Sequence, residues 1–220
     1  MKLKLRHFAC DLSQAAEIDR VAPELEQLIG REAPAGRILL INNSGFGAYG
    51  AFPAGNLGHQ LELVDVNVRA VLHLTGRLLP LLKARGGAII SVASAAAFQP
   101  TPWMAAYGAS KAFVLHWSLA LHEELRGTGV RTLAVCPGPV PTEFSRRAGM
   151  RLAKVSDRLS QSAEEVAKES LQALGRGRRQ VVTGWTNRAI TLIGGKLSKP
   201  AAARVAAWVL EGYDLRKGGS

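Results

Sequence analysis

The sequence predicts an α/β protein in which a parallel sheet carries helices on both faces, and three observations favour this class. Short apolar runs such as Ile38–Ile41 and Ala88–Val92 have the composition of strands that are buried on both sides. Segments with helical periodicity alternate with these runs, and short loops join them. Of the 220 residues 47% are hydrophobic, so residues 1–220 suffice for a single domain with a three-layer core.

The first element is predicted to be a strand, because charged and apolar residues alternate over Leu3–Cys10. This start also lacks the apolar core of a signal peptide. Asp11 and Ser13 are suited to cap a helical stretch that follows, and Pro23 is expected to interrupt or restart that helix.

From residue 37 onward, predicted strands and helices alternate. In chain order the strands are Arg37–Asn42, Ala88–Val92, Val130–Cys136 and Gln180–Thr183, and the helices are Leu57–Lys83, Met104–Leu125 and one that begins at Ser162. Residues 43–56 form a glycine-rich loop, and Arg85-Gly-Gly ends the first of these helices. Ser162-Ala-Glu-Glu165 has the form of a capping box, and the remainder to Tyr213 is helical in pattern.

The charge of +11 is concentrated in the last third of the chain. Residues 146–220 carry 15 Lys and Arg against 6 Asp and Glu. Such a segment either meets phosphates, acidic lipid headgroups or nucleic acid, or is simply a solvated surface. Aromatic residues are not interleaved with the basic ones as a base-stacking platform needs, so we expect no nucleic-acid partner.

Two cysteines, Cys10 and Cys136, lie at predicted strand ends and share no metal-ligand spacing. We interpret them as reduced packing residues and predict no metal site. No apolar stretch is long enough to cross a bilayer, so we expect a cytoplasmic protein.

Polar residues follow three of the predicted strands, at Asn42–Gly45, Ser91–Ser94 and Pro137-Gly138. In open parallel sheets, ligands bind outside the carboxyl ends of the strands. The sequence therefore predicts a site at this edge of the sheet.

Tyr107 and Lys111, in Tyr-Gly-Ala-Ser-Lys, are the most informative pair. Four residues are about one helical turn, so both side chains point the same way. A nearby ammonium can lower the pKa of a phenol, which can then exchange a proton with a substrate oxygen near neutral pH. The spacing alone is also common on helices that merely pack a ring beside a solvated amine.

Other residues strengthen the functional interpretation. Asn67 lies within a predicted helix, where asparagine is unfavourable, so either it bonds a specific group or it faces solvent. Ser94 follows a strand and can donate to an oxygen or cap a helix. The glycines of Asn42-Asn-Ser-Gly-Phe-Gly47 allow a ligand to approach the backbone, or form an ordinary turn.

In this order and spacing, the motifs resemble the short-chain dehydrogenase/reductase family, from the first residue to about Thr183, and most closely the general oxidoreductases of bacteria. The matching motifs are Asn43-Ser-Gly45, Asp65-Val-Asn67-Val68, Ser91-Val-Ala-Ser94, Tyr107-Gly-Ala-Ser-Lys111, and Pro137-Gly138 with Thr142. The resemblance implies a Rossmann-like three-layer fold and hydride transfer between NAD or NADP and a carbonyl or alcohol.

The resemblance also implies roles for individual residues. Tyr107 would exchange the proton with the substrate oxygen, while Lys111 would hold the cofactor ribose and lower the pKa of the tyrosine. Ser94 would hydrogen-bond the substrate oxygen, and Asn67 would position Lys111 through water. Besides Tyr107 and Lys111, the residues that would contact the cofactor are Asp11, Asn43, Gly45, Pro137, Gly138 and Thr142.

The chain departs from the family pattern at its start. The family's first two strands and helices, with the Thr-Gly-x-x-x-Gly-x-Gly loop, have no counterpart, a difference of roughly 45–60 residues by typical element lengths. Gly45-Phe-Gly-Ala-Tyr-Gly50 does not open a helix and is no substitute. Three explanations are a start recorded too late, a genuinely shortened protein with poor cofactor binding, and a segment supplied by another chain or by rearrangement.

In the family, the strands of the sheet lie in the order 3-2-1-4-5-6-7. Without strands 1 and 2, this order has a gap. Leu3–Ala9 would have no neighbour, and Arg37–Asn42 would present a bare apolar edge that invites pairing with another chain. Alternatively, Leu3–Ala9 slides into the vacant place beside Arg37–Asn42.

The expected substrate is a small hydrophobic carbonyl or alcohol, because the residues that would wall its site are apolar and aromatic. They are Ala96, Phe98, Gln99, Pro100, Trp103 and the loop 144–155. Four cations of that loop either meet an anionic group or face water: Arg146, Arg147, Arg151 and Lys154. The choice between NAD and NADP stays open, because residues at the ends of the family's first two strands normally determine it, and those strands have no counterpart here.

Small residues along Met104–Leu125 allow another helix to approach closely. The resemblance implies a homodimer or homotetramer, whereas ordinary packing within one subunit explains the small residues equally well.

Two rival functions remain. One is a non-catalytic remnant that binds a partner or oligomerises. The other is weak association with a membrane surface, because Arg188–Leu210 places apolar segments beside Lys196, Lys199 and Arg204.

Overall fold

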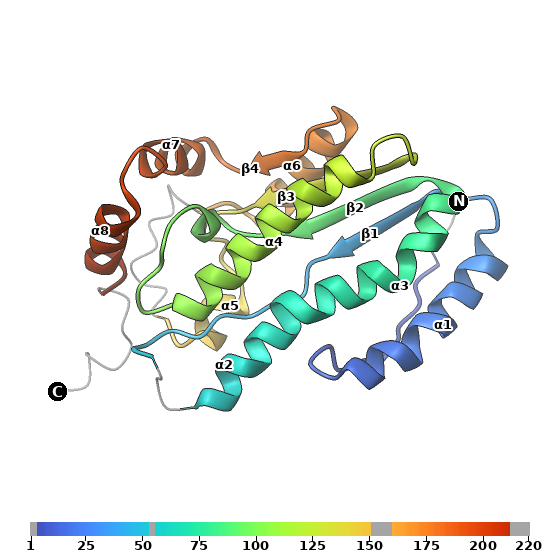
Figure 1. Cartoon of the computed structure of the whole chain (residues 1–220), viewed down its shortest axis with the longest axis horizontal. Helices are drawn as coiled ribbons and strands as arrows, with labels where there is room; N and C mark the ends of the chain where they lie inside the picture. The colour runs from blue at the N-terminus through green and yellow to red at the C-terminus, as the bar shows by residue number, and fades with distance from the viewer. Residues whose placement is uncertain (1–3, 53–55, 151–159, 212–220) are drawn as a thin grey trace.

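The computed structural model describes residues 4–52, 56–150 and 160–211 and confirms the α/β class (Figure 1). Its sheet has four parallel strands in the order β1-β2-β3-β4. They are β1 (Ile38–Asn42), β2 (Gly87–Val92), β3 (Val130–Cys136) and β4 (Gln180–Val182). The four predictions from residue 37 onward are therefore correct to within one residue at each end.

One face of the sheet is covered by α3 (Ala70–Arg85) and α4 (Ala105–Glu124). Leu78 and Leu82 of α3 pack with Ile89 of β2 and with Leu121 of α4, all of them buried. The predicted helix 57–83 is a continuous helical run with a local irregularity. It consists of α2 (Leu57–Val64), one π-helical turn over Asp65–Arg69, and α3.

The opposite face is covered by α6 (Ala163–Gly175), which packs on Ala88, Ile90, Leu133 and Val135 through Ala173 and Leu174. The predicted capping box of α6 is present, because Ser162 and Glu165 exchange hydrogen bonds at 3.1 and 2.8 Å. On β1 the same face carries Leu39 and Ile41, whose side chains are 42% and 51% exposed. The core on this face therefore stops short of the β1 edge, as predicted for a bare apolar edge strand.

The predicted N-terminal strand is wrong for the residues described. Residues 4–10 have no regular structure, and Leu5 is 66% exposed. The segment is attached to α1 (Ala15–Glu32) by Arg6, which donates to Glu32, and by Arg20, which donates to the carbonyl of Ala9. Because a strand needs a neighbour to satisfy its backbone, an isolated one does not form. The sliding of this segment into the place beside β1 is also wrong, since β1 is the terminal strand of the sheet that the described residues form.

The predicted caps and break of the first helix are wrong as well. Gln14 is the N-cap of α1 and provides no side-chain bond. Asp11 instead accepts from the amide and hydroxyl of Ser13 at 2.9 and 2.7 Å. Pro23 lies inside the unbroken helix. Burial of the neighbouring Ile18 and Ala22 against α3 supplies packing energy that offsets the missing proline hydrogen bond.

The C-terminal part contains α5 (Glu143–Arg147), α7 (Trp185–Gly194) and α8 (Lys199–Glu211). The helical pattern predicted to reach Tyr213 thus splits into two helices, and Tyr213 lies outside the described residues. Figure 1 shows α7 and α8 beyond the end of the sheet to which the strand arrows point. Within the described part of the chain, no helix combines the length and apolar character needed to cross a membrane.

Candidate active site

The structure brings all four predicted catalytic residues to the carboxyl edge of the sheet. Ser94 follows β2 and begins the 3₁₀ turn Ala95–Phe98, while Tyr107 and Lys111 lie one turn apart on α4. Asn67 comes from the π-helical turn that contacts the same helix. The site is therefore assembled from three elements that are separated in sequence.

Asn67 is 1% exposed and uses its whole amide group. Its Oδ1 accepts from the amide of Phe46 at 3.1 Å, and its Nδ2 donates to the carbonyl of Phe46 at 2.9 Å and to Ser110 Oγ at 3.1 Å. The alternative of a solvent-facing asparagine is excluded. The π-helical turn aims this side chain at both the loop after β1 and α4, so Asn67 joins the two walls of the site. Ser110 is a site residue that the sequence interpretation missed, although it stands beside Lys111 in the Tyr-Gly-Ala-Ser-Lys motif.

Lys111 is 5% exposed, and its Nζ donates to the carbonyl oxygen of Val92 at 2.8 Å. Burial lowers the pKa of this amine to about 8. A Cβ atom placed on Gly45 would lie 3.3 Å from Lys111 Nζ and 2.9 Å from Asn67 Oδ1. Both polar groups therefore reach the backbone of the exposed loop after β1, and a side chain at Gly45 would separate them from it.

Tyr107 differs from the prediction in one respect. Burial raises the pKa of the Tyr107 phenol, and the hydrogen-bonding Ser94 side chain lowers it by less. Lys111 is not among the causes, because its ammonium is directed at Val92 and lies 5.9 Å from the centre of the tyrosine ring. The predicted lowering of the phenol pKa by Lys111 is therefore absent in this structure. Ser94 faces the phenol.

Cys136 contributes to the floor of the site, which the sequence interpretation also missed. The thiol is fully buried, and burial raises its pKa to about 12, while the Ser94 amide and Lys111 oppose this shift. Cys136 thus packs below both residues as a neutral thiol, in agreement with its interpretation as a reduced packing residue.

The loop after β3 begins at the carboxyl edge of the sheet. A Cβ on Gly138 would lie 2.2 Å from the amide of the buried Asn187 in α7, so Gly138 allows close packing of α7 on this loop. The exposed Thr142 caps α5 by accepting from the amide of Phe144 at 3.3 Å. Asn43 is exposed on the loop after β1.

Helix α5 packs over the tyrosine. The Phe144 ring lies 5.2 Å from that of Tyr107, and its Cζ would be 2.8 Å from a Cβ on Gly47. The amide of Tyr49 donates to the carbonyl of Ala148 at 2.9 Å, which attaches the segment after α5 to the loop after β1. Of the predicted wall loop 144–155, residues 151–155, with Arg151 and Lys154, lie outside the described residues.

The residues present fit the half of a nicotinamide cofactor that contains the ribose bound by Lys111. The Lys111 ammonium has three donors and uses one on Val92, so two remain for ribose hydroxyls beside the open backbone of Gly45. The diphosphate half does not fit equally, because the described residues provide no strand beyond β1 and no glycine-rich turn that opens a helix. Nor do they bring together three metal-ligating side chains.

Comparisons with known proteins bear on the family and the fold of the chain. A family model described as short chain dehydrogenase matches residues 2–153. A serine 3-dehydrogenase of Rhizobium radiobacter is 39% identical over 109 residues, which cover 49% of this chain and 43% of that protein. A ketoacyl reductase of Nostoc sp. is 28% identical over 208 residues, which cover 90% of this chain and 69% of that protein. The chain spans about half the length of several curated relatives that it matches.

A solved short-chain dehydrogenase from Burkholderia cenocepacia, in complex with NADP, superposes with a TM-score of 0.71 at 27% identity. The superposition covers 89% of this chain and 76% of that one. With a family model that matches more than half of its length, this chain belongs to the short-chain dehydrogenase family.

Proposed function

We propose that the protein transfers a hydride between a nicotinamide cofactor, NAD or NADP, and a small hydrophobic carbonyl or alcohol, with Tyr107 as the general acid or base. The observation that supports this most directly is that Ser94 faces the Tyr107 hydroxyl at the carboxyl edge of the sheet. Two hydroxyls that converge in this way can hold one substrate oxygen between them.

In the reductive direction, Tyr107 gives its proton to the substrate oxygen as that oxygen gains negative charge. The raised phenol pKa keeps the proton on Tyr107 at neutral pH, which suits the acid role. Ser94 donates a hydrogen bond to the same oxygen. When bound, the nicotinamide supplies or accepts the hydride.

Lys111 and Asn67 act on the cofactor side. With a pKa of about 8, the Lys111 ammonium is mostly charged at pH 7 and can donate to ribose hydroxyls. One of its donors stays on the carbonyl of Val92, and the other two are available to the ribose. Asn67 keeps the loop after β1 and α4 at a fixed separation.

The wall beside Tyr107 favours an apolar substrate, because Phe144 contacts the tyrosine ring and Trp103 and Phe98 come from the segment before α4. The relatives named above act, by their names, on serine and on ketoacyl groups. We favour an aldehyde or ketone with a hydrocarbon substituent.

The test uses the purified 220-residue chain with NADH or NADPH and a panel of aliphatic and aromatic ketones and aldehydes, followed at 340 nm. We expect Tyr107→Phe to lower kcat/KM by about 10²-fold or more and to leave cofactor affinity nearly unchanged. Lys111→Met should weaken cofactor binding, whereas Lys83→Met, at an exposed lysine of α3, should change neither. Equal turnover by Tyr107→Phe and wild type would refute the role of the phenol.

A second candidate is a non-catalytic family member that acts by binding or oligomerisation. The bare β1 edge and the exposed Leu39 and Ile41 favour it, because an open apolar edge is a template for another chain. Fluorescence titration with both reduced cofactors separates the two functions. Absence of binding together with a stable dimer in light scattering would support this second candidate.

A further inference from the structure

Helix α7 is inverted in polarity. Its buried side chains are polar, with Asn187 at 3% and Thr191 at 6% exposure, while Trp185 is 78% and Leu192 is 71% exposed. The exposed stripe Trp185, Ala189, Leu192 and Ile193 has the i, i+4, i+7, i+8 spacing that usually faces a core. This apolar stripe points away from the protein.

The inversion is stable because the buried polar groups find partners within the same segment. Asn187 Nδ2 donates to the carbonyl of Thr183 at 3.0 Å, and Thr191 Oγ1 donates to the carbonyl of Asn187 at 3.0 Å. The inner face of α7 therefore needs no apolar contact. Its apolar residues are left for a contact outside the domain.

Helix α8 repeats the pattern sixteen positions later. Val205, Trp208 and Val209 are 53%, 80% and 47% exposed, and they continue a stripe that begins at Ala201. Trp208 corresponds to Leu192, and Val209 to Ile193. Together the two helices expose two tryptophans and five large aliphatic side chains. We call this surface the α7–α8 face: Trp185, Ile190, Leu192, Ile193, Val205, Trp208 and Val209.

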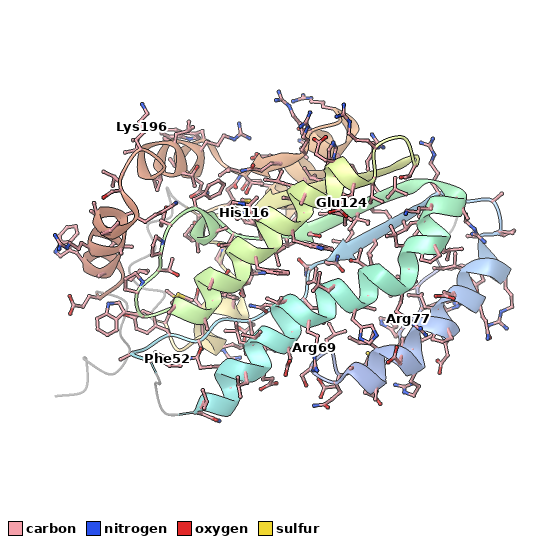
Figure 2. The ribbon with its side chains drawn as sticks, viewed as in Figure 1. Phe52, Arg69, Arg77, His116, Glu124 and Lys196 are labelled. Atoms are coloured by element: carbon pink, nitrogen blue, oxygen red, sulfur yellow. The ribbon has the colours of Figure 1, made fainter. Side chains whose placement is uncertain are left out.

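The charges beside the α7–α8 face are cationic. Residues 185–211 contain Arg188, Lys196, Lys199 and Arg204 against one acidic residue, Glu211. Arg188 pairs with Glu169 at 2.7 Å and Lys199 donates to the carbonyl of Phe98, so these two also serve the fold. Figure 2 shows Lys196, between the two helices, pointing away from the body of the protein. Lys196 and Arg204 are therefore the two cations of this segment that can contact an anion outside the protein.

We propose that the α7–α8 face docks on the surface of an anionic lipid membrane. Tryptophan and aliphatic side chains would enter the boundary between headgroups and acyl chains, and Lys196 and Arg204 would contact acidic headgroups. A second copy of the chain is the weaker occupant, because apolar stripes flanked by like charges would bring cations together across the interface. The same flank is complementary to acidic lipid. Docking on lipid does not require catalytic activity.

Flotation with vesicles tests the proposal with the full chain. At low salt we expect the protein to float with vesicles of phosphatidylcholine and phosphatidylglycerol at 7:3, and to stay at the bottom with phosphatidylcholine alone. Raising the salt should reduce flotation. Tryptophan emission should shift to the blue on addition of the anionic vesicles, because Trp185 and Trp208 leave water. No flotation with anionic vesicles at low salt would overturn the proposal.

Variants assign the binding to this face. Leu192→Glu with Trp208→Glu should abolish flotation, while Leu171→Glu, at a leucine that is 54% exposed on α6, should leave it unchanged. Lys196→Gln and Arg204→Gln should each lower vesicle affinity about fivefold at low salt. Circular dichroism checks that each variant is folded. Flotation unaffected by Leu192→Glu and Trp208→Glu, or a vesicle-free dimer that these changes dissociate, would refute membrane docking.

Discussion

Replacing Asn67 by alanine tests whether this site residue also holds the fold together. The change removes three hydrogen bonds, at 2.9, 3.1 and 3.1 Å, from a side chain that is 1% exposed. It leaves the amide and carbonyl of Phe46 without partners at a half-buried position. A buried polar group that loses its partner costs about 1–3 kcal/mol, and water reaches part of this backbone. We expect Asn67→Ala to lower the free energy of unfolding by about 2–3 kcal/mol.

The assay is urea unfolding without cofactor, followed by circular dichroism, with thermal unfolding as a second measurement. A loss of this size should lower Tm by about 4–12 °C for a domain of this length. Asn43→Ala is the matched control, because it removes the same amide from an exposed neighbour on the same loop and should cost less than about 0.5 kcal/mol. If the two variants lose equal stability, Asn67 does not join the loop to α4.

Three further predictions concern stability and association. The Lys111 pKa is depressed to about 8 from 10.5, so the unfolded state binds more protons between these values, and Lys111 should contribute about 1 kcal/mol of added stability from pH 8 to pH 9. The Cys136 thiol, whose pKa is raised from 9.0 to about 12, opposes part of this rise in both chains, so the measurement is the difference in unfolding free energy between wild type and Lys111→Met, which should grow by about 1 kcal/mol over this range. Gly108→Ala should cost about 1–3 kcal/mol despite the better helix propensity of alanine, because its Cβ would lie 1.8 Å from Thr101 Oγ1; Thr101→Ala in the same chain should recover most of the loss in urea unfolding. Ile41→Lys should change stability by less than about 0.5 kcal/mol and reduce self-association in light scattering, and unchanged association would show that the β1 edge is not its cause.

The strands from residue 37 onward were predictable because each is a short apolar run bounded by glycine, proline or asparagine. The absence of a strand over residues 4–10 was not predictable, because charged and apolar residues alternate regularly there. Periodicity describes a side-chain pattern, whereas a strand forms only if another strand satisfies its backbone. Likewise Pro23 is compatible with α1 because burial of its neighbours outweighs the local penalty.

The sequence brought together Asn67, Ser94, Tyr107 and Lys111, but it missed Ser110 and Cys136 and did not reveal the geometry. Residue spacing placed Tyr107 and Lys111 on one side of α4, and the order of strands placed Ser94 near them. The sequence does not reveal that Lys111 bonds Val92, that Phe144 packs on the tyrosine, or that a π-helical turn aims Asn67. These features depend on tertiary distances of a few ångströms, which no local pattern encodes.

The inverted polarity of α7 and the bare edge of β1 place two apolar surfaces at different locations, and their chemistry separates their partners. The β1 edge exposes Leu39 and Ile41, and the parallel ladder directs their amides and carbonyls away from β2. Water or another extended backbone satisfies those groups, whereas lipid acyl chains do not, so a lipid surface does not suit this edge. The α7–α8 face has its backbone satisfied within helices and offers side chains alone, with cations beside them. A disordered lipid surface can match such a face, because it requires no register.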